Sequence, residues 1–406
     1  MKPFRIAETF VDDARYAAAS MRANSGFAAA VALTLALGIG TVTAMFSVVD
    51  RLLLRAPSHI SDVGQVRRIF AAVPGPDGRE RIIPWFPYPA YAALRVGHTF
   101  AAVAAYAQHT TVIGRGADAR PVAGASATSD FFPLLGTRPF MGRLFAPTDD
   151  DPRALAQVVI LSYEFWQREF NGSPAALGKM LPVDDRAFTI IGVLPPGFTG
   201  TELGKTDFWI PMQAESTNWA TSWSRGFINI VVRVTHGSAE EALARDATSR
   251  MNDAAGTGLW SYARLAVRPI SSDRHGNLPA VFAVAKWLGA VALVVLLIVC
   301  ANVANLLLAR ALDRRRETAV RLALGASTSR LMRLIATESL IITCIGGAGG
   351  LLLALVGGEA IRQRFLADIV WDAGVVDGRS LAVAATLTIL AALLTSVFTM
   401  LQAGGT

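Results

Sequence analysis

The residue types that carry most metal and nucleophile chemistry are spread thinly along this sequence. Five histidines occur, and no two have the spacing of a metal-ligand pair: His59, His98, His109, His236 and His275. The HExxH motif of zinc helices and the GxSxG turn of serine nucleophiles are both absent. We therefore expect no catalytic residues and no metal site in this chain.

Two other clusters each have two interpretations. The run Asp149-Asp150-Asp151 could bind Ca²⁺, but the EF-hand spacing is missing and Pro152 follows, so a solvated turn is favoured. The segment Gly200–Thr206 resembles a phosphate-binding loop, but it is one residue short and has Thr199 where the first glycine belongs. We reject a nucleotide site here and predict that this chain is not an ATPase.

The elements that must position any functional residue are dominated by apolar helices. Hydrophobic residues make up 52% of the 406 residues and charged residues 17%, and the mean hydropathy is +0.41. Four windows contain no charged residue: 25–49, 287–309, 339–358 and 380–406. Each window is long enough, as a helix, to cross a hydrocarbon core of about 30 Å. The sequence predicts an α-helical membrane protein with four transmembrane helices, at 25–49 and at about 287–309, 339–358 and 380–402.

Charge in the short loops predicts the orientation of these helices. Residues 310–333 contain seven arginines against Asp313 and Glu317, a net charge of +5, whereas residues 359–379 have a net charge of −1. Because positive loops stay in the cytoplasm, we expect segments 1–24 and 310–333 inside and residues 51–286 outside. The net charge of +7 therefore reflects topology, and no nucleic-acid partner is expected.

The segment 51–286 has an ordinary soluble composition, in which period-2 apolar runs alternate with helical stretches. It predicts a large mixed α/β extracytoplasmic domain, of two lobes, inserted between the first and second transmembrane helices. The expected strands are 66–73, 111–113, 121–126, 157–161, 187–193, 227–234 and 263–269. The expected helices are 88–96, 130–136, 163–170 and 238–254. Cys300 and Cys344 both lie in predicted spans, so this domain has no disulfide.

Small and polar residues within the spans predict how the helices pack. Ala36, Gly40 and Ala44 share one face of the first span, and Gly346 and Gly350 share one face of the third, which lets helix backbones approach closely. Asn302 and Asn305 are unfavourable in lipid, so we expect them to face another helix. Interhelical hydrogen bonding is favoured over a transport pathway.

The segment 309–337 predicts a short amphipathic helix on the cytoplasmic side that ends at Gly325. An apolar face lies among five charged residues and the glycine that ends the helix: Arg314, Arg315, Arg316, Glu317, Arg321 and Gly325. One interpretation is a solvated loop that stops membrane transfer, and the other is a lever that docks into a cytoplasmic partner. The pattern alone leaves both open.

Motifs along nearly the whole chain resemble the MacB/FtsX-like family of ABC transporter permeases. LTLALGIG and FSVVD lie within Phe27–Leu54, and DFFPLLG at Asp130–Gly136 and IIGV at Ile190–Val193 resemble the MacB-like periplasmic core. ANVANLLLAR and RRRETAVRLALGAS, within Ala301–Leu340, resemble the FtsX-like domain that would comprise residues 287–406.

The resemblance implies a multi-pass protein of the bacterial cytoplasmic (inner) membrane with a cytoplasmic N-terminus. It implies a dimer that works with a cytoplasmic ABC ATPase subunit and transmits ATP-driven motion to the external domain. By position, Glu317, Arg321 and Gly325 would contact that ATPase. Because 24 residues precede the first span, we expect a separate ATPase chain, which would bind ATP and Mg²⁺, and no cofactor in this chain.

Two further expectations concern partners and cargo. The chain ends soon after the fourth span, so its partner is a second copy in a homodimer or a second permease half, within membrane lipid. The expected activity is efflux or export of an antimicrobial compound, a peptide or a lipoprotein. The alternative is a membrane scaffold or signal transducer that controls an envelope protein without moving a solute.

Overall fold

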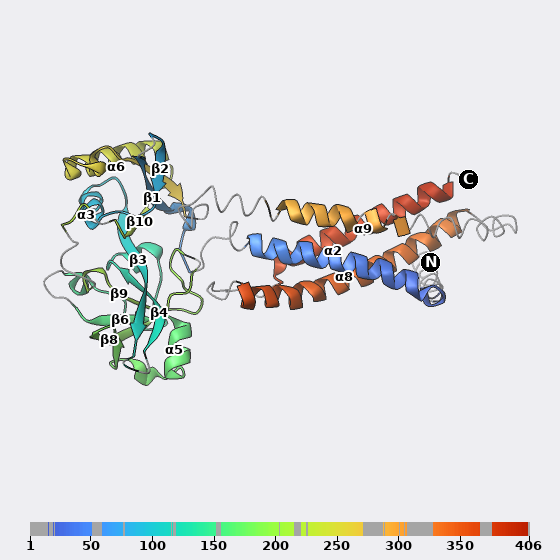
Figure 1. Cartoon of the computed structure of the whole chain (residues 1–406), viewed down its shortest axis with the longest axis horizontal. Helices are drawn as coiled ribbons and strands as arrows, with labels where there is room; N and C mark the ends of the chain where they lie inside the picture. Colours follow the sequence, from blue (N-terminus) through green and yellow to red (C-terminus); the bar gives the residue numbers. More distant parts are fainter. Residues whose placement is uncertain are drawn as a thin grey trace, which may run out of the picture. The chain divides into compact units, whose positions relative to one another are not determined.

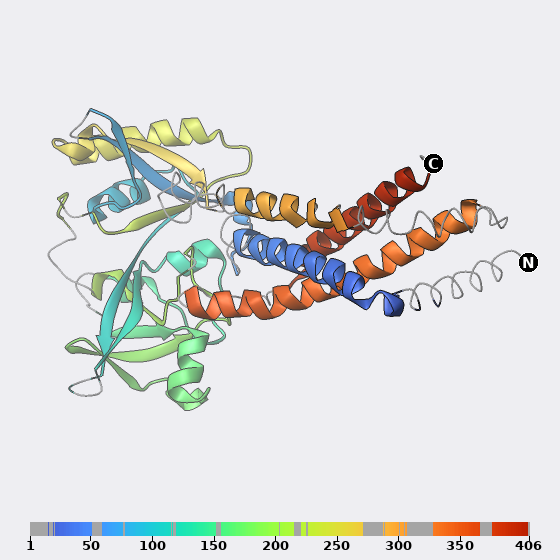
Figure 2. The same ribbon diagram turned by 45° about the vertical axis from the view of Figure 1, so that its right-hand side comes forward.

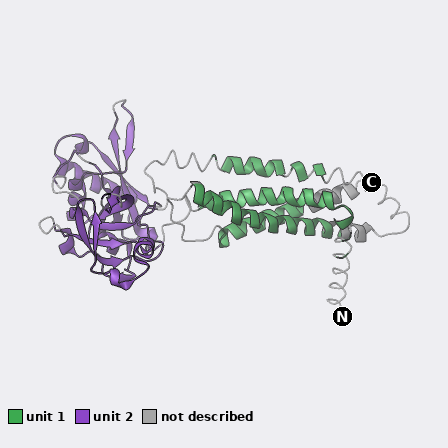
Figure 3. Ribbon diagram, turned by 60° about the horizontal axis from the view of Figure 1, so that its bottom comes forward, with its two compact units in different colours: residues 1–52, 283–367, 373–406 green, residues 53–282, 368–372 purple. Residues whose placement is uncertain are grey.

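A computed structural model gives the fold of the chain. It describes residues 15, 19, 21–50, 59–75, 78–114, 116, 119–151, 156–202, 204–214, 221–224, 226–270, 287, 289–299, 301–303, 305–306, 328–365 and 376–404, without the side chains of 328–332, 334–336, 365 and 394–404. The chain divides into two compact units, which Figure 3 colours separately. Unit 1 is helical and is formed by Met1–Leu52, Ala283–Ala367 and Ala373–Thr406, and unit 2 contains Leu53–Phe282 with Asp368–Asp372.

Unit 2 is built on one mixed sheet, in which the described residues form eleven strands. Their order is β11-β1-β10-β3-β4-β9-β6-β8-β5, with β2 paired to β1 and β7 paired to β3 and β8. The strands are β1 (Val66–Pro74), β2 (Glu80–Ile83), β3 (Ala102–Ile113), β4 (Arg120–Ala127), β5 (Met141–Gly142), β6 (Val158–Leu161), β7 (Met180–Val183), β8 (Arg186–Val193), β9 (Phe208–Pro211), β10 (Asn229–Arg233) and β11 (Arg264–Pro269). The pairs β4–β9 and β6–β8 are parallel and the other pairs are antiparallel.

Short helices cover both faces of this sheet. They are α3 (Tyr88–Val96), α4 (Phe131–Leu135), α5 (Tyr163–Phe170) and α6 (Glu240–Ala255), with the 3₁₀ turns η2 (Val63–Gln65), η4 (Pro147–Asp150), η5 (Pro174–Ala176), η6 (Met212–Ala214) and η7 (Leu259–Ser261). Side chains alternate across a strand, so Val103 and Ala105 of β3 join a core with α3 and α6, whereas Ala104 and Tyr106 join a core with α4. The first half of β3, at residues 103–107, is therefore buried on both faces.

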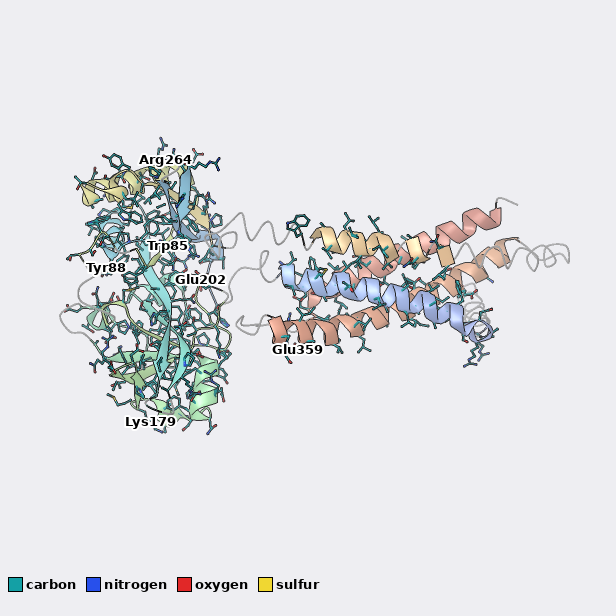
Figure 4. The ribbon with its side chains drawn as sticks, viewed as in Figure 1. Trp85, Tyr88, Lys179, Glu202, Arg264 and Glu359 are labelled. Atoms are coloured by element: carbon teal, nitrogen blue, oxygen red, sulfur yellow. The ribbon has the colours of Figure 1, made fainter. Side chains whose placement is uncertain are left out.

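The core of unit 2 is divided between the two ends of the sheet. One apolar cluster surrounds β11, β1 and β10 with α3 and α6, and another surrounds β6 and β8 with α5. Figure 2 shows these two groups at opposite ends of the unit, and Arg264 of β11 and Lys179 beside β7 mark those ends in Figure 4. The sheet is continuous, so the two predicted lobes are two ends of one sheet.

Local sequence signals account for several of these elements. The Ser162 hydroxyl accepts a hydrogen bond from the Phe165 N–H and caps α5. Gly136 ends α4 at a φ of +71°, a left-handed conformation that favours glycine. The structure confirms strands near every predicted position, but β2, β5, β7 and β9 were not predicted, and β3 begins nine residues before the predicted strand.

Unit 1 is a bundle of apolar helices. It contains α2 (Ser25–Val49), the helix Gly289–Val303, α8 (Thr328–Phe365) and α9 (Gly378–Gly404). Residues of α2 at helical spacing, including Val31, Leu35 and Ile39, form its core with Val299 and Ile342. Contacts of Leu35 with Gly346 and of Ile39 with Gly350 show that α2 and α8 run parallel. The helix Gly289–Val303 runs in the direction opposite to α2 (Figure 1).

Two helices in the described part of the chain are long and apolar enough to cross a membrane, Ser25–Val49 and Thr337–Arg364. Two more apolar helices, Gly289–Val303 and Gly378–Leu393, are shorter. The number of spans and the insertion of unit 2 between them stay predictions. The helix α8 has 38 residues and begins at Thr328, so the last residues of the predicted loop 310–333 are helical.

Candidate functional site

The helices α2 and α8 pack with their backbones in close contact. A Cβ atom placed on Gly40 would lie 2.8 Å from the carbonyl oxygen of Gly350. One placed on Gly346 would lie 2.7 Å from the Cβ of Leu35, and one on Gly350 would lie 3.1 Å from the Ala36 oxygen. Any side chain at these positions would therefore push the helices apart.

The structure thus brings together four of the predicted packing residues: Ala36, Gly40, Gly346 and Gly350. We call this contact the α2–α8 seam. Ala44 lies farther along α2 and is buried. Because these residues are small, the backbones of the two helices approach closely, and dispersion attraction between them stabilises the contact.

Polar side chains connect the three helices beyond the end of the seam. Arg379, at the start of α9, places Nη1 3.0 Å from Oδ1 of Asp50, which follows α2. The Asp50 side chain is 2% exposed and that of Arg379 is 62% exposed. The buried Arg362 of α8 donates from Nη2 to the Ser47 hydroxyl at 3.2 Å. We call Ser47, Asp50, Arg362 and Arg379 the polar clamp.

Asn302 and Asn305 lie on an exposed side of the helix Gly289–Val303 and of its continuation at residues 305 and 306. Both side chains are exposed in unit 1, whereas Val299 and Val303 on the other side of the same helix are buried against the bundle. The expectation that the asparagines face another helix stays a prediction. The apolar valines fill the contact with α2, where Val299 lies 2.5 Å from the position of a Cβ on Gly38.

The predicted coupling residues lie outside the described residues. They are Arg314, Arg315, Arg316, Glu317, Arg321 and Gly325. Their proposed role therefore rests on the sequence alone. The structure describes the helix that follows them along the chain. That helix, α8, starts at Thr328 and continues without interruption through the seam to Phe365.

A charged network is buried in unit 2. Arg68 of β1, whose side chain is 4% exposed, donates to Glu202 Oε1 at 2.9 Å and to Asn229 Oδ1 at 2.5 Å. The Tyr106 hydroxyl also donates to Glu202 Oε1, at 2.6 Å. Burial raises the pKa of Tyr106, so the phenol stays protonated and acts as a donor. Buried charges need such partners, and this network joins β1, β3 and β10.

The Asp149–Asp151 run is not the solvated turn that its sequence favours. Asp149 is buried, pairs with Arg143 at 2.5 Å and accepts from the Ala146 N–H at 2.8 Å. Asp150 accepts from the Ser129 N–H at 3.1 Å. Burial, with a smaller contribution from the Asp130 charge, raises the pKa of Asp150 to about 6. The carboxylates diverge to different partners, and no group of three or more metal-binding side chains occurs among the described residues.

The segment Gly200–Thr206 also has a structural role. Glu202 is directed into the Arg68 network and is labelled in Figure 4, and Lys205 lies 3.5 Å from Asp207. The segment leads into strand β9, whereas a phosphate-binding loop leads into a helix whose N–H groups hold the phosphates. Its lysine and its acidic side chain therefore already have protein partners.

Two family models together match most of the chain. The MacB-like periplasmic core domain matches residues 28–250, and the FtsX-like permease C-terminal domain matches residues 289–405. The chain belongs to the MacB/FtsX-like family of ABC transporter permeases. The resemblance seen in the sequence motifs is thereby confirmed.

Curated relatives of this MacB/FtsX-like permease include exporters and a permease. It is 27% identical over 235 residues to the pyoverdine export ATP-binding/permease protein PvdT of Pseudomonas savastanoi pv. phaseolicola, which is 57% of this chain and 34% of PvdT. It is 24% identical over 360 residues to the macrolide export ATP-binding/permease protein MacB of Azoarcus sp., which is 87% of this chain and 53% of that protein. The uncharacterized ABC transporter permease YknZ of Bacillus subtilis is 26% identical over 220 residues, 54% of this chain and 53% of YknZ. The chain thus spans between a third and about half of the length of these relatives.

Solved structures similar to this permease are single external domains. The periplasmic region of MacB from Actinobacillus actinomycetemcomitans has a TM-score of 0.39 and 16% identity, over 52% of this chain and 91% of that one. The extracellular domain of YknZ from Gram-positive bacteria has a TM-score of 0.39 and 16% identity, over 50% of this chain and 98% of that one.

Sequence reasoning missed the polar clamp of this permease. Asp50 directly follows the uncharged window 25–49, and Arg379 directly precedes the window 380–406. In the sequence they marked the ends of predicted spans, and Arg379 also counted toward the loop charge. A signal was present, because opposite charges at the end of one span and at the start of another can pair across helices that run in opposite directions. Arg362 gave no signal, because its burial depends on the packing of α8.

Proposed function

We propose that this chain is a permease subunit that transmits an ATP-driven conformational change from a cytoplasmic ATPase to an extracytoplasmic unit 2. The observation that carries the proposal is the continuity of α8, whose 38 residues include both the seam and Arg362 of the polar clamp. At about 1.5 Å per residue such a helix is about 57 Å long, nearly twice a hydrocarbon core of about 30 Å. It reaches beyond both surfaces of a bilayer.

The proposed topology is four spans with the N-terminus in the cytoplasm of a bacterial inner membrane. Helix directions support it. The helices α2 and α8 are parallel, the helix Gly289–Val303 is opposed to α2 (Figure 1), and the start of α9 lies at the end of α2. A chain that crosses the membrane four times produces this alternation. Unit 2 then follows the first span on the outer side.

The mechanism follows from contacts along this helix. An ATPase that binds the arginine-rich segment 310–333 moves the start of α8. Because the backbones of the two helices are in close contact along the seam, α8 would carry α2 with it. The polar clamp holds α9 in the same motion, and α2 leads directly into unit 2 along the chain. Motion is transmitted, and this chain performs no chemistry.

The relatives support an exported cargo. Two of them are named for the export of pyoverdine and of macrolides, and we propose an antimicrobial, peptide or lipoprotein cargo for this chain. The partner ATPase would bind ATP and Mg²⁺. The second half of the transporter would be another copy of this chain or a different permease half, in contact with membrane lipid.

Co-isolation with an ATPase tests the proposal. The full chain, purified from its own membranes, is expected to carry an ATP-binding subunit, and Glu317→Lys and Arg321→Glu are each expected to reduce that subunit at least tenfold. Glu241→Lys and Arg245→Glu are matched controls, because this pair has the same i, i+4 spacing on the exposed face of α6. ATPase recovery that is unchanged by the loop substitutions would contradict the proposal, and an ATPase-free complex with an envelope protein would favour a scaffold.

A further inference from the structure

Asp150 lies where separate segments of unit 2 meet. It ends η4 and accepts a hydrogen bond at 3.1 Å from the N–H of Ser129, just before α4. The turn η6 packs against η4 and brings the Gln213 N–H close to the same carboxyl group. The helix α3 brings Arg95 within electrostatic reach. A change in the charge of Asp150 therefore acts on elements that are far apart in the sequence.

One oxygen of this carboxyl group has no hydrogen-bond partner. Asp150 Oδ1 is buried, and among the described residues no group donates to it. A neutral carboxyl group tolerates such surroundings, whereas a charged carboxylate there strongly favours a donor or a cation. Burial accordingly raises the pKa of Asp150 to about 6. Above that pH the buried oxygen is charged and lacks a partner.

The ionisable side chains around Asp150 include a single cation. Those that face it from neighbouring elements are Tyr88, Tyr91 and Arg95 of α3, of which Tyr88 is labelled in Figure 4, and Asp130 at the start of α4. Burial raises the pKa of both tyrosines, so they stay neutral at pH 4–8. Asp149 and Asp151 flank it along the chain, and Asp149 pairs with Arg143. Arg95 is therefore the positive charge that can stabilise an ionised Asp150.

Arg95 is paired with a different carboxylate in this structure. Its Nη2 lies 3.0 Å from Oδ2 of Asp130, and the two side chains are 50% and 38% exposed. Ion pairs with this exposure contribute little to stability. A cation beside a buried carboxylate gains more, because water screens the two charges less. A change of partner therefore becomes favourable for Arg95 when Asp150 ionises.

We propose that Arg95 moves from Asp130 to Asp150 when Asp150 ionises, which makes the end of α3 a pH-dependent switch in unit 2. At low pH the last turn of α3 is held to the start of α4, and at higher pH it is held to η4. Because α3 and α4 pack in different apolar clusters, the exchange alters how two parts of the core are connected. Unit 2 is proposed to lie outside the cytoplasm, where pH follows the medium. The inference goes beyond the proposed function, and its test requires neither an ATPase nor a cargo.

A fluorescent probe at the end of α3 tests this exchange in the full chain in detergent. In a background with Cys300→Ser and Cys344→Ser, a cysteine replaces Val96, which follows Arg95 and is 84% exposed, and carries an environment-sensitive bimane. His98→Gln is included, because this exposed imidazole two residues away titrates in the same pH range. We expect the emission to change between pH 4 and 8, with a midpoint near pH 6.

Three substitutions separate an exchange of partners from simple titration. Asp150→Asn stays neutral at every pH, so the emission change should fall at least fivefold. Arg95→Gln should lower it as much, although Asp150 still ionises and thermal unfolding of this variant should still depend on pH. Asp130→Asn frees Arg95 to bind Asp150, so the midpoint should fall by at least one pH unit, and the emission at pH 8 should match that of the background.

Two controls show whether the response is local. The bimane at Met180→Cys on β7, a side chain that is also exposed, should not report the change. Arg264→Gln breaks another exposed ion pair, with Glu80, and should leave the titration at Val96→Cys intact. An emission change that persists in Asp150→Asn or Arg95→Gln would overturn the inference. So would a midpoint that Asp130→Asn leaves in place, or a background without any change near pH 6.

Discussion

At the scale of single residues, Asp150 makes the stability of unit 2 depend on pH. Its carboxylate accepts from the Ser129 N–H and lies within electrostatic reach of Asp130 and Arg95. Burial raises its pKa to about 6, from an ordinary value of 3.8. Between these pH values the folded state holds a proton that the unfolded state has released, so the free energy of unfolding falls as pH rises. The loss is complete above about pH 6.

We predict that Asp150→Asn stabilises unit 2 at neutral pH, by at most about 3 kcal/mol. The amide removes the buried charge and still offers an oxygen to the Ser129 N–H. At pH 4 the gain should nearly vanish, because Asp150 is then protonated in the folded state. Thermal unfolding of the full chain in detergent at pH 4, 6 and 8 measures this. Asp253→Asn, at an exposed site of α6, is the control, and an equal gain at all three pH values would contradict the prediction.

At the scale of elements, the α2–α8 seam depends on the absence of side chains. Gly40→Ala would place a methyl group 2.8 Å from the backbone oxygen of Gly350, which cannot rotate away. We predict a loss of about 1–3 kcal/mol, the usual range for overpacking. Gly357→Ala in α8 is the matched control, because no atom lies within 4 Å of a Cβ there, and its higher helix propensity should stabilise slightly. Equal melting temperatures of the two variants would show that the helices are not closely packed at Gly40.

Sequence patterns predicted most elements of unit 2, but strands buried on both faces were harder. The segment 102–107 has apolar residues on both faces, so it lacks the alternation that identifies a half-buried strand. The strand β9 consists of four buried residues, ends in Pro211 and was missed entirely. Caps and turns were easier, because a side chain such as Ser162 acts on its own neighbours.

Some features of the candidate site could likewise be predicted from the sequence, and others could not. The small residues of the seam were visible as a spacing along each helix, although which helices meet depends on the whole bundle. The partner of Asn302 and Asn305 was left open, because polarity alone shows that a side chain needs a partner and not which helix supplies it. The clamp residue Arg362 is buried by contacts that no local pattern encodes.

At the scale of the whole molecule, the polar clamp should decide whether motion of α8 reaches unit 2. Asp50→Asn removes the ion pair with Arg379, a charge-assisted contact typically worth about 2 kcal/mol. We predict that the variant still co-isolates with its ATPase, whereas ATP-dependent changes in hydrogen exchange across the strands of unit 2 fall at least threefold. Glu359→Gln is the control, because this exposed side chain lies at the same end of α8 (Figure 4) and, among the described residues, accepts from Gln363 of its own helix. A rigid connection through the seam alone would leave the exchange response of Asp50→Asn intact, and the clamp would then serve stability and not transmission.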